Sequence, residues 1–257
     1  MSKISGVLLV VGATGSIGQH VVASGLAHGY TLRALVRDGS RAKDFPASVQ
    51  TVVGDMTRPE TLSAAVEGVD AIVFTHGSYG NPAAAADVDY GAVRNVLAAL
   101  GNRRARIALM STIGATDRRG SHDWKRRGER LVRASGLPYT IVRPAWFDHN
   151  RPDQLQLLML QGDKDLAGNP TDGVIARRQI AEVLVRSLSS EAALRKTFEL
   201  HAETGPEQAD FDTVFAPLAA DPADALDGAR DKANMPLAQE PDQIRAELQA
   251  VRDRAAG

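Results

Sequence analysis

Short apolar runs alternate with helical patterns along roughly the first 145 residues of the chain. The run 7–11 is apolar throughout, as expected of a central parallel strand that is buried on both faces. Alternation of such runs with amphipathic segments is typical of a parallel sheet with crossover helices. The predicted strands are 7–11, 31–36, 49–53, 71–74, 107–110 and 139–142, and the predicted helices are 16–27, a segment built on Val93, Val96, Leu97 and Leu100, and 124–135.

After Pro144 the pattern becomes less regular, with a predicted helix at 180–188 and a short strand at 197–200. From residue 203 the composition shifts to Ala, Asp, Glu and Pro, and the chain ends on apolar residues at helical spacing, which predict a helix packed on the domain or on a partner. We therefore expect an α/β fold with a Rossmann-type doubly wound parallel sheet. The expected organisation is a dinucleotide-binding domain over 1–202, whose small substrate lobe is mainly 146–202, and a C-terminal helical extension over 203–257.

A glycine-rich loop separates the first predicted strand from the first predicted helix and reads Gly12-Ala13-Thr14-Gly15-Ser16-Ile17-Gly18. Glycine is needed where the chain turns tightly, where the backbone approaches a pyrophosphate, and where a helix packs closely on a strand. The helix that follows supplies free N–H groups for the anion. This strand–turn–helix context predicts a phosphate loop for NAD(P), with a tight turn that binds nothing as the alternative.

The end of the second strand indicates which dinucleotide is bound. A carboxylate about 20 residues past the loop would bind the ribose of NAD, whereas arginine there accommodates the 2′-phosphate of NADP. Arg37 stands at that position, and Arg41 follows it closely enough for the two guanidinium groups to clamp a phosphate. Asp38 could instead serve NAD or pair with an arginine. We predict NADP(H) over NAD(H).

The loops after the third and fourth strands supply the remaining predicted cofactor contacts. Asp55 could accept a bond from the adenine amino group, cap a helix beginning near Thr57, or do both. Met56 follows it, and Thr75 and Gly77 would lie along the ribose side of the cofactor. His76, between them, is equally consistent with an ordinary loop histidine.

Composition and charge narrow the class of protein. The formal net charge of the 257 residues is −1, and the cluster Arg103, Arg104 and Arg106 is interpreted as a solvated helix end rather than a nucleic-acid site. Cysteine is absent, which removes disulfides, thiolate nucleophiles and cysteine-ligated metals, and no metal site is predicted. No apolar stretch is long enough for a signal peptide or a membrane span. We expect a cytoplasmic protein whose partner is a small-molecule substrate, with no nucleic acid or membrane, and we leave a homodimer open.

Together these residues resemble the short-chain dehydrogenase/reductase superfamily, and most closely its atypical branch of NmrA-like and flavin/biliverdin reductase-like proteins. The resemblance covers roughly residues 6–200 and implies a Rossmann fold, NAD(P) binding and a substrate lobe formed largely after Pro144, which would border the nicotinamide. Its motifs, in order, are the glycine loop, Val36-Arg37-Asp38, Gly54-Asp55, Asp89-Tyr90 with Asn95, Ser111-Thr112, and the run from Gly136 to Pro144.

The resemblance also implies a catalytic set of a hydroxyl, a tyrosine and a lysine. Lys125 matches the lysine, which would also hold the nicotinamide ribose, and Thr112 or Ser111 beside it matches the hydroxyl. The tyrosine should stand four residues before the lysine on the same helix face, but Ser121 occupies that position. A serine hydroxyl is a poor proton donor, so we interpret Ser121 as a helix N-cap before Trp124.

This departure leaves several explanations open. The acceptor could be electron-poor, such as a flavin or quinone, or His122 or His149 could supply the proton. The chain could instead bind NADP as a non-catalytic, NmrA-like redox sensor, or be an isomerase or epimerase that retains its cofactor. Trp124, Trp146 and Phe147 either stack on a planar substrate or pack the lobe against the sheet. The function we expect is an NADP(H)-dependent oxidoreductase acting on a small planar carbonyl, quinone or flavin-like acceptor.

Overall fold

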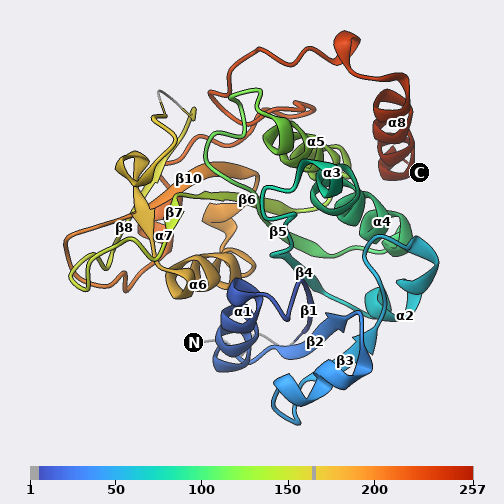
Figure 1. The fold of residues 1–257 in the computed structure, drawn as a ribbon, viewed down its shortest axis with the longest axis horizontal. Coiled ribbons are helices and arrows are strands. Elements are labelled where there is room, and N and C mark those ends of the chain that lie inside the picture. The colour runs from blue at the N-terminus through green and yellow to red at the C-terminus, as the bar shows by residue number, and fades with distance from the viewer. Residues whose placement is uncertain (1–5, 164–165, 257) are drawn as a thin grey trace.

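The computed structural model describes residues 6–163 and 166–256, and this part of the chain forms a central sheet with helices on both faces (Figure 1). Its eight strands follow the order β3-β2-β1-β4-β5-β6-β10-β8, and every pair except β10–β8 is parallel. The strand order reverses between β1 and β4, the kind of switch point at which doubly wound sheets bind ligands beyond the carboxyl ends of their strands. The predicted α/β Rossmann-type fold is confirmed.

The elements lie close to their predicted positions because the apolar runs and helical periods are strong in this sequence. The described strands are β1 (Val7–Val11), β2 (Thr31–Val36), β3 (Gln50–Val53), β4 (Ala71–Phe74), β5 (Arg106–Met110), β6 (Tyr139–Pro144), β7 (Trp146–Phe147), β8 (Gln156–Leu160), β9 (Val174–Ile175) and β10 (Lys196–Glu203). The described α-helices are α1 (Ser16–Ala27), α2 (Ser63–Val66), α3 (Pro82–Ala85), α4 (Gly91–Leu100), α5 (Gly120–Ala134), α6 (Arg177–Ser187), α7 (Asp212–Phe215) and α8 (Asp242–Ala256).

Each face of the sheet buries its own hydrophobic core. Because neighbouring residues of a strand point to opposite faces, Leu8 and Val10 of β1 enter one core, while Leu9 and Val11 enter the other. Helices α1 and α6 cover the first face, and α4 and α5 cover the second (Figure 1). This double cover explains why the strand is apolar at every position.

The region after Pro144 contributes both to the central sheet and to a smaller unit. β10 runs parallel to β6, and β8 pairs antiparallel with β10 at the edge of the sheet. β7 and β9 form a separate two-stranded sheet. β8 is not among the strands predicted from the sequence, because only Leu157 of its five residues is fully buried and the apolar signal is weak.

Helix α5 begins earlier than expected, at Gly120 instead of Trp124. The N-cap position belongs to Arg119, so the interpretation of Ser121 as the N-cap is wrong, and Ser121 lies within the first helical turn. This turn carries no apolar periodicity, because His122 hydrogen-bonds to the loop after β5 instead of packing into a core.

The end of the chain folds back over helix α5. Residues Ile244, Leu248 and Val251 of α8 are buried against the core that α4 and α5 share, which confirms a surface-packed terminal helix. Residues 221–240, which we call the C-terminal strap, are mostly irregular and run along α5 before α8 begins (Figure 1). Within the described ranges, no helix is both long and apolar enough to cross a bilayer.

Candidate functional site

The glycine loop between β1 and α1 has the geometry of a phosphate loop. Gly12 has a φ of +92°, and a Cβ placed on it would lie 2.8 Å from the backbone nitrogen of His76. A Cβ on Gly18 would lie 2.1 Å from the carbonyl oxygen of Gly12, so any side chain there would force α1 away from β1. Gly15 stands at the N-cap of α1 without a side-chain cap, which leaves N–H groups of the first turn available to an anion.

A pocket of about 360 Å³ opens from this loop across the carboxyl ends of β1 to β4, and we call it the β1–β4 groove. It brings together seven of the residues predicted to bind the cofactor, which are Gly12, Thr14, Gly15, Arg37, Met56, Thr75 and Gly77. Ile17 and Gly18 are buried in α1, and Ser16 is exposed at its start. The predicted residues Arg41, Asp55, Lys125 and Pro144 do not line this groove.

The end of β2 presents Arg37 to the groove and holds the neighbouring charges in local contacts. Asp38 accepts hydrogen bonds from the backbone and hydroxyl of Ser40 and thereby caps the 3₁₀ turn 39–44. These bonds keep the pKa of Asp38 below its ordinary value. The guanidinium of Arg41 pairs with Asp44 at 2.5 Å. Of the two predicted arginines, Arg37 therefore faces the groove while Arg41 is engaged beside it.

The loop after β3 is held by its own polar groups. Asp55 accepts hydrogen bonds from the backbone and hydroxyl of Thr57. No helix begins near Thr57 as predicted, and the next helical turn begins at Pro59. Burial raises the pKa of Asp55, but the Thr57 hydrogen bonds and the charge of Arg37 outweigh it and lower that pKa. The amide of Asn95 donates to the Met56 carbonyl and fixes Met56 in the groove wall.

Helix α5 reaches the loop after β4 through Lys125. Its ammonium lies 3.0 Å from the carboxylate of Asp89, which also accepts the backbone N–H and hydroxyl of Ser78. Burial and the charge of Lys125 lower the pKa of His76 to about 4, so this imidazole is neutral at physiological pH. His76 Nδ1 and Ser111 Oγ are buried without a hydrogen-bond partner among the described residues.

These two orphaned polar atoms provide a test of whether a dinucleotide fits. Buried polar groups are normally hydrogen-bonded, and exceptions mark places where a ligand completes the network. His76 lines the β1–β4 groove, and Ser111 directly follows β5, the neighbour of β4. Ribose hydroxyls and a carboxamide, which both donate and accept hydrogen bonds, would satisfy them. The residues present therefore fit the ribose and nicotinamide end of the cofactor.

A second pocket, of about 390 Å³, opens beyond the carboxyl ends of β5 and β6, and we call it the β5–β6 pocket. Its apolar wall comes from Ile113, Pro144, Ala145, Trp146, Phe147 and Leu166, and its polar groups come from Thr112, Asp117, Arg119, His122 and Asp172. Because β4, β5 and β6 pair in parallel, this pocket lies at the same edge of the sheet as the β1–β4 groove. It contains the predicted residues Thr112 and Pro144.

The two histidines considered as proton donors occupy different places. His122 lines the β5–β6 pocket, and its Nδ1 lies 2.7 Å from the Gly114 carbonyl. A carbonyl only accepts, so Nδ1 carries the hydrogen of this bond, and Nε2 is the ring nitrogen left for another partner. His149 is exposed and lines a different pocket, so the structure separates it from Thr112. Trp124, a residue of α5, packs against Tyr90, while Trp146 and Phe147 line the β5–β6 pocket.

Tyr79 and Arg177 are among the residues at the site that were missed from the sequence. Tyr79 lines the β1–β4 groove with 90% of its surface exposed, and the Gly77-Ser78-Tyr79-Gly80 segment could have drawn attention to it. Arg177 donates to Ser16 Oγ at 3.0 Å, pairs with Asp148, and lies over the Phe147 ring. No local pattern signals Arg177, because 161 residues separate it from Ser16.

A family model described as NAD(P)H-binding matches residues 12–191, which include both the groove and the β5–β6 pocket but end before the C-terminal strap. The chain is 30% identical to an NAD(P)H azoreductase of Xenophilus azovorans over 218 residues, covering 83% of this chain and 73% of the relative. It is 28% identical over 207 residues to a Bacillus subtilis protein named uncharacterized sugar epimerase YhfK, covering 75% of this chain and 92% of the relative.

The fold is also similar to that of solved structures. The solved structure of the oxidoreductase ylbE from Lactococcus lactis superposes with a TM-score of 0.66 at 17% identity, covering 82% of this chain and 96% of that chain. A likeness at this identity concerns the fold. Among residues 6–163 and 166–256, no group of three or more histidine, aspartate and glutamate side chains is arranged to hold a metal ion.

Proposed function

This chain belongs to the NAD(P)H-binding family, and on that premise we propose that it is an NADPH-dependent reductase of small, planar, conjugated carbonyl, quinone or flavin-like acceptors. The observation that carries the proposal is the position of the β5–β6 pocket. A pocket with an aromatic and apolar wall opens at the same sheet edge as the β1–β4 groove, and Thr112 and His122 are among its polar groups. Planar conjugated molecules are favoured by such walls.

The preference for NADPH is supported by Arg37. It faces the β1–β4 groove, while Asp38, the carboxylate that could have bound the ribose of NAD, is engaged in capping the turn at Ser40. A guanidinium binds a phosphate through charge-assisted hydrogen bonds. In this arrangement Gly12, Gly15 and the start of α1 hold the pyrophosphate, and Arg37 holds the 2′-phosphate.

The remaining residues divide between positioning and proton transfer. NADPH, when bound, supplies a hydride. Lys125, fixed by Asp89, stands beside the backbone of Gly77 and positions the ribose, while His76 Nδ1 and Ser111 Oγ complete the hydrogen bonding around it. Thr112 polarises the acceptor, and His122 delivers a proton from Nε2.

Ser121 stands where the resemblance to the superfamily places a catalytic tyrosine, and the loss of that acid supports an electron-poor acceptor. A carbonyl that is not conjugated needs a strong acid as hydride arrives, whereas a quinone, flavin or azo compound takes hydride with little help. The azoreductase relative acts, by its name, on a compound of this kind. The sugar epimerase relative favours a second candidate, an epimerase in which the residues of the groove would retain the dinucleotide and the β5–β6 pocket would hold a sugar.

The test is oxidation of NADPH, measured by loss of the reduced-nicotinamide absorbance, with menadione, riboflavin, an azo dye and cyclohexanone. We expect turnover with the first three and little with the ketone. Tight NADPH binding without turnover on any acceptor would refute the reductase and favour a sensor. A cofactor that co-purifies and is not released would favour the epimerase.

A further inference from the structure

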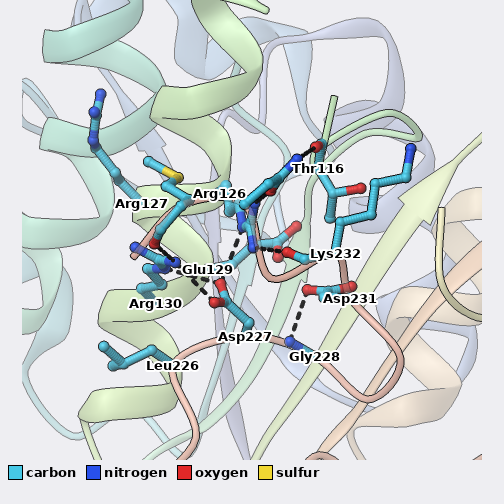
Figure 2. Close-up of polar contacts among 12 residues, drawn as sticks. Thr116, Arg126, Arg127, Glu129, Arg130, Leu226, Asp227, Gly228, Asp231 and Lys232 are labelled. Atoms are coloured by element: carbon cyan, nitrogen blue, oxygen red, sulfur yellow. Dashed lines mark hydrogen bonds and ion pairs between the residues drawn. The ribbon is translucent and has the colours of Figure 1, made fainter. Parts of the chain in front are cut away.

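The C-terminal strap is bound to α5 by buried charges. Arg126 of α5 has no exposed surface, and its guanidinium donates to the Asp227 carboxylate and the Lys232 carbonyl (Figure 2). It also donates to the Asn234 side-chain oxygen. Arg130 binds the same Asp227 through two further bonds. These contacts satisfy every nitrogen of Arg126, so they place residues 227–234 at one position along the helix.

From this anchor the strap reaches the loop that follows β5. The side-chain amide of Asn234 donates to the backbone carbonyl of Thr116 at 2.8 Å. The backbone carbonyl of Asn234 accepts a hydrogen bond from the guanidinium of Arg118 at 2.5 Å. The ammonium of Lys232 lies 3.0 Å from the Asp117 carboxylate. Figure 2 shows Thr116 and Lys232 on the same side of Arg126, with the strap passing close to the helix.

The same loop forms part of the β5–β6 pocket. Gly114, Asp117 and Arg119 line that pocket. The loop is also held by the buried carboxylate of Asp163, which accepts from the backbone of Gly114 and Thr116. The strap and Asp163 therefore both hold this pocket wall, whereas the hydrogen bonds of the strap do not reach the residues of the β1–β4 groove.

We propose that the C-terminal strap is a positioning element of the β5–β6 pocket, with Asn234 as the residue that transmits the position of Arg126 to the loop 114–119. The strap lies outside residues 12–191, the part of the chain matched by the family model. The proposal rests on the proposed function in one respect, which is that the β5–β6 pocket receives the acceptor. The control of the loop by Asn234 stands on the contacts alone.

The decisive variant is Asn234→Asp. A carboxylate at this position still accepts the bond from Arg126, so the strap stays anchored, but it can no longer donate to Thr116 and repels that carbonyl. Asn234→Ala removes both contacts. The matched control is Arg230→Ala, an exposed residue of the same strap for which no side-chain hydrogen bond or ion pair is found among the described residues.

Two measurements that need no turnover test the proposal in the full-length protein. Hydrogen exchange at amides 114–117 should accelerate roughly fivefold to tenfold in Asn234→Asp, the effect of about 1 kcal/mol from one lost hydrogen bond. Menadione affinity, followed by quenching of tryptophan fluorescence, should weaken by a similar factor, while the Kd for NADPH and the melting temperature stay close to wild type. In turnover, KM for the acceptor should rise with kcat nearly unchanged.

Wild-type exchange and menadione affinity in both Asn234 variants would overturn the proposal. So would an equal loss of NADPH affinity, because the effect would then be general. If the wild-type protein reduces no acceptor, the proposed function fails, and the exchange rates still decide whether the strap positions the loop. Should Asn234→Ala fail to fold, Asn234→Asp, which keeps the anchor, carries the test.

Discussion

The β1–β4 groove and the wall of the β5–β6 pocket are built in different ways. In the groove, several shaping contacts join residues two or three apart, as in the Gly15–Gly12, Asp38–Ser40 and Asp55–Thr57 hydrogen bonds, although the Asn95–Met56 bond is long-range. The strap that holds the pocket wall is anchored by contacts of Arg126 that cross 101 to 108 residues of chain. The groove is therefore shaped largely by local turns on a sheet, while the pocket wall depends on how the end of the chain docks.

The two regions also differ in the burial of their charged side chains. At the groove, the guanidinium of Arg37 is exposed. Beneath the strap, Arg143 and Glu129 are fully buried and paired with each other, and Arg143 also binds Asp231 of the strap. Breaking a buried pair is costly because the remaining charge stays desolvated, whereas an exposed charge loses little.

The largest effect is expected from Arg143→Ala. It would leave Glu129 and Asp231 buried without their main cation, at a cost of about 3–5 kcal/mol in the free energy of unfolding measured by denaturant titration. Removing the exposed cation in Arg58→Ala, which pairs with Glu60 on the surface, should change stability little. Similar losses in the two variants would contradict the difference between the regions.

The free energy of unfolding should depend on pH through Glu199, a residue of β10 that faces this buried network. Burial and the nearby carboxylates of Asp163 and Asp231 raise its pKa to about 7 despite Arg143, 3.5 Å away. The folded state then holds a proton that the unfolded chain releases near its ordinary pKa. The stabilisation is complete below that ordinary value and is lost as the pH rises through about 7, with a slope of at most about 1.4 kcal/mol per pH unit.

The measurement is the free energy of unfolding between acidic and mildly alkaline pH. Glu199→Gln, which cannot ionise, should flatten the decline. Glu60→Gln is the control, because hydrogen bonds lower the pKa of this exposed carboxyl, in contrast to the raised pKa of Glu199. An unchanged slope in Glu199→Gln would assign the pH dependence to another group.

The smallest effect on the fold, and the most selective one, is expected from Arg37→Ala. Loss of a charge-assisted contact should weaken NADPH binding roughly 10- to 100-fold while NADH binding and stability change little. Arg41→Ala should have a smaller effect, because Arg41 is already paired with Asp44. Titration of protein fluorescence with both cofactors provides the measurement, and equal losses for NADPH and NADH would refute the predicted preference.

Helix α5 shows why part of the site escaped prediction. Its residues Arg126, Glu129, Arg130 and Arg133 recur at helical spacing, a pattern that usually faces solvent. In the structure this charged stripe is buried, because acidic residues of the strap cover it. Charge complementarity between segments some 100 residues apart leaves no periodic signal in either segment. Arg177 at the phosphate loop was missed for the same reason.

The sequence by itself determined the strands of the sheet other than β8, the glycine loop and the approach of Arg37 to it, because apolar runs, glycine turns and a fixed distance past the loop are local properties. Only the tertiary structure decided that Lys125 meets Asp89, that His122 and not His149 shares a pocket with Thr112, and that the strap supports that pocket. Each of these depends on side chains that meet because the sheet and the docked end of the chain bring distant segments together. No pattern within a single segment encodes such a meeting.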